Sequence, residues 1–86
     1  MKTWTVYLVM CSDNTLYCGC TTNLPLRIRV HNLKKGAKYT RGRCPVKVVA
    51  FVENLSHGDA LRLERKIKSL HKDEKVPFLK RYKPTR

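Results

Sequence analysis

Acidic residues are scarce in this sequence. Its 86 residues include six Asp and Glu against nineteen Lys and Arg, which gives a formal net charge of +13. A surplus of this size favours a polyanionic partner, either a nucleic acid or an anionic membrane surface. The plain alternative is a basic protein without such a partner. The apolar content of 42% excludes wholesale disorder.

Long apolar runs are missing as well. No segment is apolar for long enough to span a bilayer, so we expect no membrane partner. The N-terminus also lacks the shape of a secretory signal, because Ser12-Asp13-Asn14 interrupts the apolar run that follows Trp4. These absences predict a cytoplasmic protein that is not secreted and keeps its cysteines reduced.

The cysteine spacing of a zinc site is missing too. Cys18 and Cys20 are separated by a single residue, which is too tight for the usual two-residue knuckle. No second Cys or His pair accompanies them. We therefore expect the thiols to be small, half-buried residues of strands.

The residues that are present predict a small α+β domain. Apolar, β-forming runs alternate with turn clusters and with two helix-forming patterns. The expected ranges, in chain order, are strands at 4–11 and 16–20, a helix at 24–33, a strand at 46–52 and a helix at 57–71. A small antiparallel sheet flanked by helices fits this order.

The rest of the chain is basic. Residues 34–45 are expected to form a loop that carries five Lys and Arg side chains. Residues 72–86 are expected to form a charged tail, with at most a short helix around 73–82, because Pro77 opposes one. The prediction is a single domain over 1–86, with a core at about 4–75 and a basic C-terminal tail at 76–86.

Glu64 is unusual within the second long helix. Ala60, Leu63 and Ile67 recur at three- and four-residue intervals and define a core-facing stripe, and Glu64 falls on its border. Burying a lone carboxylate is costly. Two explanations remain open: a peripheral glutamate paired with Arg65 or Lys68, or a carboxylate held at a cleft to bind a hard cation such as Mg²⁺.

The first helix places an arginine beside a histidine. Arg27 and His31 are four residues apart and share one face, whereas Arg29 points roughly 160° away from Arg27. The pair is suited to orienting a phosphate. It is equally consistent with a rim pair that has no function.

Two tyrosines occupy the expected hairpin. Tyr7 and Tyr17 both have odd numbers, so an odd-length loop around Asp13-Asn14-Thr15 places them on the same face of the sheet. Buried tyrosines at such positions are usually packing residues. The alternative is a pair of phenols that contact water and phosphate.

These blocks together resemble the GIY-YIG nuclease superfamily. Thr5-Val6-Tyr7 and Tyr17-Cys18-Gly19 stand where the family has its two naming tripeptides. Three further blocks, at 26–32, 36–42 and 60–64, follow in the family's order, so the resemblance covers about residues 4–75. It is closest to small stand-alone members of bacterial type and to the nuclease domain of structure-specific resolvases. Cys20 stands where the excision-repair members carry a lysine.

The resemblance implies a three-stranded antiparallel sheet and a metal-dependent endonuclease, with DNA as the expected substrate. Glu64 would hold one divalent ion, Mg²⁺ or Mn²⁺. Arg27 would neutralise charge on the scissile phosphate and Tyr7 would be the general base. Tyr17 would position the water or phosphate, and His31 would be a phosphate ligand or a partner that orients Tyr7.

The basic loop would hold the substrate strand. Its expected contacts with phosphates are Lys38, Tyr39, Thr40, Arg41 and Arg43, with the Tyr39 ring available to stack on an unpaired base. A solvated linker is the alternative for this loop. For the whole chain, the alternatives are a non-catalytic nucleic-acid-binding module of the same fold and a structural basic protein. A protein partner that supplies specificity is compatible with each.

Overall fold

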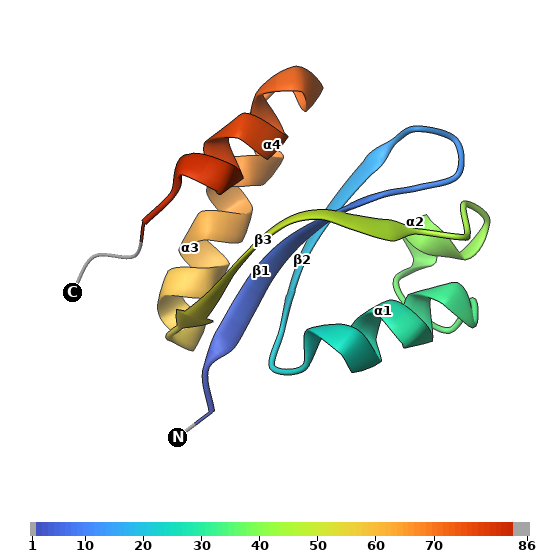
Figure 1. Cartoon of the computed structure of the whole chain (residues 1–86), viewed down its shortest axis with the longest axis horizontal. Coiled ribbons are helices and arrows are strands. Elements are labelled where there is room, and N and C mark those ends of the chain that lie inside the picture. Colours follow the sequence, from blue (N-terminus) through green and yellow to red (C-terminus); the bar gives the residue numbers. More distant parts are fainter. Residues whose placement is uncertain (1, 84–86) are drawn as a thin grey trace.

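A three-stranded antiparallel sheet with helices on both faces forms the protein (Figure 1), and the computed structural model describes residues 2–83. The elements are β1 (Trp4–Met10), β2 (Leu16–Thr21), α1 (Leu24–Asn32), α2 (Lys38–Arg41), β3 (Lys47–Leu55), α3 (His57–Lys68) and α4 (Lys72–Arg81). The strand order is β2-β1-β3. The predicted α+β class and the three-stranded sheet are confirmed.

The hairpin has the expected odd register. Met10 pairs with Leu16, so the five residues 11–15 form the loop between β1 and β2. Asn14 adopts a left-handed backbone conformation with φ 66°, which asparagine tolerates in turns. The Asp13 carboxylate accepts hydrogen bonds from the backbone N–H and the hydroxyl of Thr15.

The sheet separates two apolar clusters. Side chains alternate between the faces of a strand, so Val6 and Leu8 of β1 pack toward α3 and α4, where they meet Ala60, Leu63 and Ile67. Tyr7 and Val9 lie on the other face, together with Cys11 and Val46, and α1 packs there through Leu24 and Ile28. The side chains of Tyr7 and Tyr17 therefore share the α1 face.

The C-terminal region differs from the expected tail. Helix α4 continues through Pro77, and Leu79 is fully buried in the α3 face of the core. A proline inside a helix removes one backbone hydrogen bond and costs about 3 kcal/mol. Burial of Leu79, with Val76 and Phe78 packed beside it, offsets that cost. The core therefore extends past residue 75.

The expected basic loop contains the one-turn helix α2. Its third residue, Thr40, is fully buried, because its hydroxyl has partners inside the protein. None of the helices in the described part of the chain is long and apolar enough to cross a membrane.

Candidate active site

Three buried side chains form a hydrogen-bonded chain on the face of the sheet that α1 covers. The Tyr7 hydroxyl is 2.9 Å from His31 Nε2, and His31 Nδ1 is 2.8 Å from the Thr40 hydroxyl. The Thr40 hydroxyl donates to the Ala37 carbonyl oxygen at 2.9 Å. Tyr7, His31 and Thr40 are each at most 1% exposed, so water does not compete for these bonds.

The direction of these bonds follows from the proton count. The Thr40 hydroxyl has one hydrogen, which it donates to Ala37, so it accepts from His31 Nδ1. A neutral imidazole carries one N–H, which leaves Nε2 as an acceptor. The Tyr7 hydroxyl therefore donates its proton to His31 Nε2.

Two glycines make room for this chain. A Cβ atom at Gly19 would lie 2.5 Å from the Tyr7 hydroxyl oxygen, and a Cβ atom at Gly36 would collide with His31 Nδ1. Any other residue at these positions would displace the phenol or the imidazole. Gly19 and Tyr7 are direct partners in the β1–β2 register.

Arg27 is the cation nearest to this chain. Burial raises the pKa of Tyr7 to about 12, and Arg27 opposes the rise through a hydrogen-bonding and a charge interaction. Burial first, and then the charge of Arg27, lower the pKa of His31, which keeps the imidazole neutral. Arg27 is half-buried and Arg29 is exposed, which is the orientation expected from their helical spacing.

Tyr17 lies beside Tyr7 at the same face, with ring centroids 6.4 Å apart. Its ring also stacks on Tyr39 at 5.7 Å. The guanidinium carbon of Arg43 lies 4.1 Å from the centre of the Tyr39 ring, and Arg43 Nε donates to the Asp13 carboxylate at 2.8 Å. These contacts connect the hairpin loop to α2 and cover Tyr17.

Three residues of the basic segment have partners inside the protein, and one of them, Thr40, differs from its predicted role. Thr40 was expected to contact phosphate, but it is buried and bonded to His31. The Tyr39 ring contacts Tyr17 and Arg43 and the residue is 40% exposed, so its stacking on a base stays a prediction. Arg43 bonds Asp13 and the Tyr39 carbonyl. Lys38 and Arg41 are exposed.

Glu64 approaches from the opposite face of the sheet. One carboxylate oxygen accepts a hydrogen bond from the Cys20 thiol at 3.3 Å, and the other pairs with Lys68 at 2.7 Å. Cys20 alternates with Gly19 along β2, so its side chain points toward α3 rather than toward Tyr7. The contacts of Tyr7, Tyr17 and His31 with one another do not include Glu64, so the action of all these residues on one phosphate stays a prediction.

One strand, β2, separates Glu64 from the two tyrosines. β2 is at the edge of the sheet, and the residue bonded to Glu64 directly follows Gly19, which packs on Tyr7. The pKa of Lys68 is raised, mainly by its hydrogen bond to Glu64 and in smaller part by Tyr17. Charges on the two faces of the sheet thus affect each other around β2.

A divalent ion at Glu64 would need ligands from outside the protein. Among residues 2–83, no three His, Cys, Asp or Glu side chains are grouped closely enough to hold a metal. Mg²⁺ is commonly bound by one or two carboxylates together with waters and substrate phosphate. The Glu64 side chain is 18% exposed and borders a hollow with Leu61, Arg65 and Lys68, so its chemistry fits such an ion.

Sequence reasoning missed two features of this site. The buried position of Thr40 was hidden by its charged neighbours, although a hydroxyl among five basic side chains is the exception in that segment. The sequence showed Gly36 only as a glycine within a basic block and did not indicate that it makes room for His31. Both act through His31, whose position depends on how residues 34–45 fold back over α1.

Comparisons with known proteins identify the family of the chain. Residues 3–77 match the GIY-YIG catalytic domain family. The chain is 41% identical over 78 residues to a UPF0213 protein of Nitratidesulfovibrio vulgaris, and the match covers 91% of this chain and 71% of that relative.

Two solution NMR structures are similar as well. The UPF0213 protein BH0048 from Bacillus halodurans is 38% identical, with a TM-score of 0.57, over 91% of this chain and 83% of that one. The protein EF2693 from E. faecalis is 32% identical, with a TM-score of 0.65, over 93% of this chain and 85% of that one. The chain therefore belongs to the GIY-YIG catalytic domain family.

Proposed function

We propose that this protein is a metal-dependent endonuclease that hydrolyses a phosphodiester of a nucleic acid, with DNA as the expected substrate. The observation that carries the proposal is the buried hydrogen bond between Tyr7 and a neutral His31, with Arg27 beside them. A binding surface alone does not require a buried acceptor behind a tyrosine hydroxyl. Membership of a nuclease family supports the same reaction class.

The basicity of Tyr7 depends on His31. A phenol with a pKa of about 12 is protonated at neutral pH, so it does not accept a proton unless it releases its own. The Tyr7 hydroxyl donates to His31 Nε2. Because Tyr7 is 1% exposed and interacts with Arg27, the attacking water reaches its oxygen only where the Arg27 side chain turns toward the substrate phosphate. As the water loses a proton to the Tyr7 oxygen, the Tyr7 proton passes to Nε2 and the hydroxide bonds to phosphorus. The bond between phosphorus and the 3′ oxygen breaks, and the leaving oxygen takes a proton from solvent.

Neighbouring groups stabilise the charges that develop on His31 and on the phosphate in this step. The imidazolium formed on His31 is favoured by the negative phosphate of the substrate. Arg27 neutralises the charge that develops on the phosphate oxygens. Tyr17 donates a hydrogen bond that positions the phosphate or the water, and the exposed Lys38 and Arg41 contact flanking phosphates.

Glu64 is the residue that would hold the metal, which when bound supplies positive charge to the phosphate and the leaving 3′ oxygen. The carboxylate must then exchange its contact with Lys68 for the ion, because Lys68 occupies one of its oxygens. The Lys68 side chain is 53% exposed, so water would solvate its ammonium group after this exchange.

One observation favours a second function. Glu64 lies on the face opposite Tyr7 and is already paired with Lys68 and Cys20, which is compatible with a purely structural carboxylate. The protein would then be a non-catalytic module that binds nucleic acid through its net charge of +13.

Cleavage of labelled DNA with and without Mg²⁺ separates the two functions. The nuclease proposal expects metal-dependent loss of substrate that is abolished in Glu64→Ala and lowered at least 10²-fold in Tyr7→Phe. Lys68→Ala is the matched control, because it frees the same carboxylate without removing it and is expected to retain cleavage. Metal-independent activity, or full activity of Glu64→Ala, would refute the proposal.

A further inference from the structure

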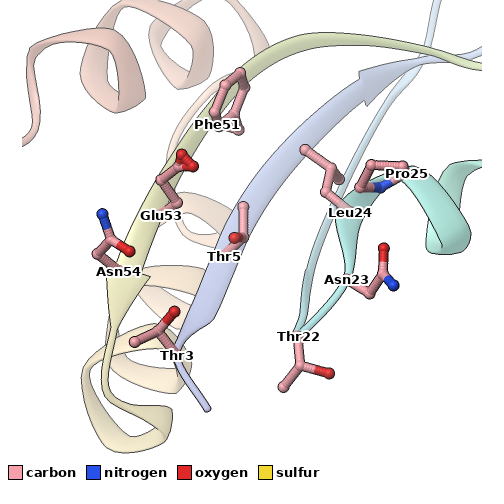
Figure 2. A pocket seen from close by; sticks show the side chains of 9 residues that line it. All are labelled: Thr3, Thr5, Thr22, Asn23, Leu24, Pro25, Phe51, Glu53 and Asn54. Carbon is pink, nitrogen blue, oxygen red and sulfur yellow. The ribbon is translucent and has the colours of Figure 1, made fainter. Parts of the chain in front are cut away.

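A hollow on the α1 face lies next to the candidate active site. It has a volume of about 420 Å³ and lies between β3 and the start of α1. Figure 2 shows Phe51, Glu53 and Asn54 along one side, Leu24 and Asn23 along the other, and Thr5 between them. None of these side chains belongs to the Tyr7–His31–Thr40 chain.

The sheet register places this hollow one step from Tyr7. Phe51 is the direct partner of Tyr7 across β1 and β3, so both side chains point to the same face. Thr5 precedes Tyr7 by two residues on that face, a distance of about 7 Å along a strand. Leu24 packs against the cluster that contains Tyr7. The Tyr7 hydroxyl lies over Gly19 of β2, so the hydroxyl and the hollow flank β1 on one face of the sheet, and a nucleotide next to the scissile one would cross that strand to reach the hollow.

The lining combines a flat apolar end with a polar end. The Phe51 ring is 51% exposed and Leu24 lies across from it, whereas Thr5, Asn23, Glu53 and Asn54 supply hydroxyl, amide and carboxylate groups. A nucleobase has the same two properties, a π-face that stacks on aromatic rings and an edge that forms hydrogen bonds.

The charge of the hollow distinguishes a base from a phosphate. Glu53 is the one charged side chain among the residues that line it, in a protein with a net charge of +13. A carboxylate repels phosphate and only accepts hydrogen bonds. It is complementary to an exocyclic amine, such as that of cytosine.

We propose that this hollow receives one unpaired nucleobase adjacent to the scissile phosphate, with Phe51 as the stacking surface and Glu53 favouring a base that has an exocyclic amine. The inference rests on the proposed function in that the ligand is a nucleic acid. A base paired within a duplex does not reach such a hollow without leaving the stack. The substrate class is therefore DNA with an unpaired nucleotide at the cut.

The test is a binding measurement in EDTA, where no cleavage is needed. The probes are short DNA duplexes with one bulged cytosine, one bulged thymine, one bulged abasic residue or no bulge. The wild type is expected to bind the bulged cytosine about tenfold more tightly than the abasic bulge, because stacking is lost without the base.

The variants assign this preference to the hollow. Phe51→Ala is expected to bind the bulged cytosine and the abasic bulge equally, and Phe51→Trp to retain the difference. Glu53→Gln is expected to lose the preference for cytosine over thymine. Leu33→Ala is the matched control, since Leu33 is 60% exposed just after α1, and it should behave like the wild type.

Two results would overturn the inference: equal binding of cytosine and abasic bulges by the wild type, or an unchanged tenfold difference in Phe51→Ala. Tyr7→Phe and Glu64→Ala are expected to keep the base preference. If the wild type shows the base preference but does not cleave DNA, the nuclease proposal fails and the base site stands. If it cleaves DNA without a base preference, the base site fails and the nuclease proposal stands.

Discussion

Tyr7 depends on residues far from it in the sequence. Its hydroxyl is backed by His31 on α1, which is in turn held by Thr40 of α2. Gly19 and Gly36 leave the space that the two rings occupy. Single changes in this group are therefore expected to affect turnover even where they touch no substrate.

The two arginines of α1 should have different roles. Arg27→Ala is expected to lower single-turnover cleavage by about 10²-fold or more while changing binding little, because a positioned cation acts mainly on the transition state. Arg29→Ala is expected to weaken binding modestly and leave cleavage nearly intact. The measurement uses saturating enzyme with Mg²⁺.

Arg27→Lys completes this comparison. A lysine keeps the charge but lacks the planar two-pronged contact of a guanidinium, so only partial rescue is expected. If Arg29→Ala loses cleavage and Arg27→Ala cleaves normally, the assignment along this helix is wrong by two residues.

His31 should make stability depend on pH. Its pKa in the folded protein is lowered below 6.5 by burial and by Arg27, so the unfolded chain binds this proton first as pH falls. The contribution of His31 to the free energy of unfolding is therefore expected to be constant above pH 6.5. As pH falls below 6.5, this contribution is expected to decrease by at most about 1.4 kcal/mol per pH unit.

Urea unfolding of the wild type and of His31→Gln between pH 5 and 8 checks this, and the variant should have a shallower slope below pH 6.5. NMR titration of the His31 ring in the wild type gives the same information if the variant does not fold. A His31 pKa at or above 6.5 would contradict the expectation.

Among the elements, α4 is an integral part of the core. Leu79→Ala is expected to reduce the free energy of unfolding by about 2–5 kcal/mol, because the fully buried side chain leaves a cavity. Leu61→Ala removes the same atoms at an exposed position and should change it by less than about 0.5 kcal/mol. Equal effects in chemical denaturation would show that α4 is not packed as described.

The segment 34–45 combines two functions within one turn of helix. Replacing the exposed Lys38 and Arg41 by alanine is expected to flatten the dependence of log K on log salt by about one unit per lost phosphate contact. Thr40→Val, between them, should leave that slope unchanged and lower thermal stability instead, because it unpairs His31. Filter binding over a salt series distinguishes the two.

For the whole molecule, binding and cleavage should separate under chelation. The net charge of +13 attracts nucleic acid without a metal, whereas the proposed chemistry needs an ion at Glu64. EDTA is therefore expected to stop cleavage and to change affinity by less than about twofold, and added Mg²⁺ should restore cleavage. Loss of binding in EDTA would instead indicate that the metal holds the substrate.

The sequence by itself determined the α+β class, the odd hairpin register and the shared face of Arg27 and His31. Each of these depends on local periodicity: alternation along a strand, or a four-residue interval on a helix. The family also followed from ordered local blocks, and the match over residues 3–77 confirms it.

Only the tertiary structure decided the rest. Thr40 is buried because α2 packs against His31, and α4 passes through Pro77 because Leu79 fills the core. Glu64 lies on the border of its helix, as expected, but the sheet stands between that helix and the tyrosines. Such outcomes depend on which element covers which face, and long-range packing overrides what local propensity and charge indicate.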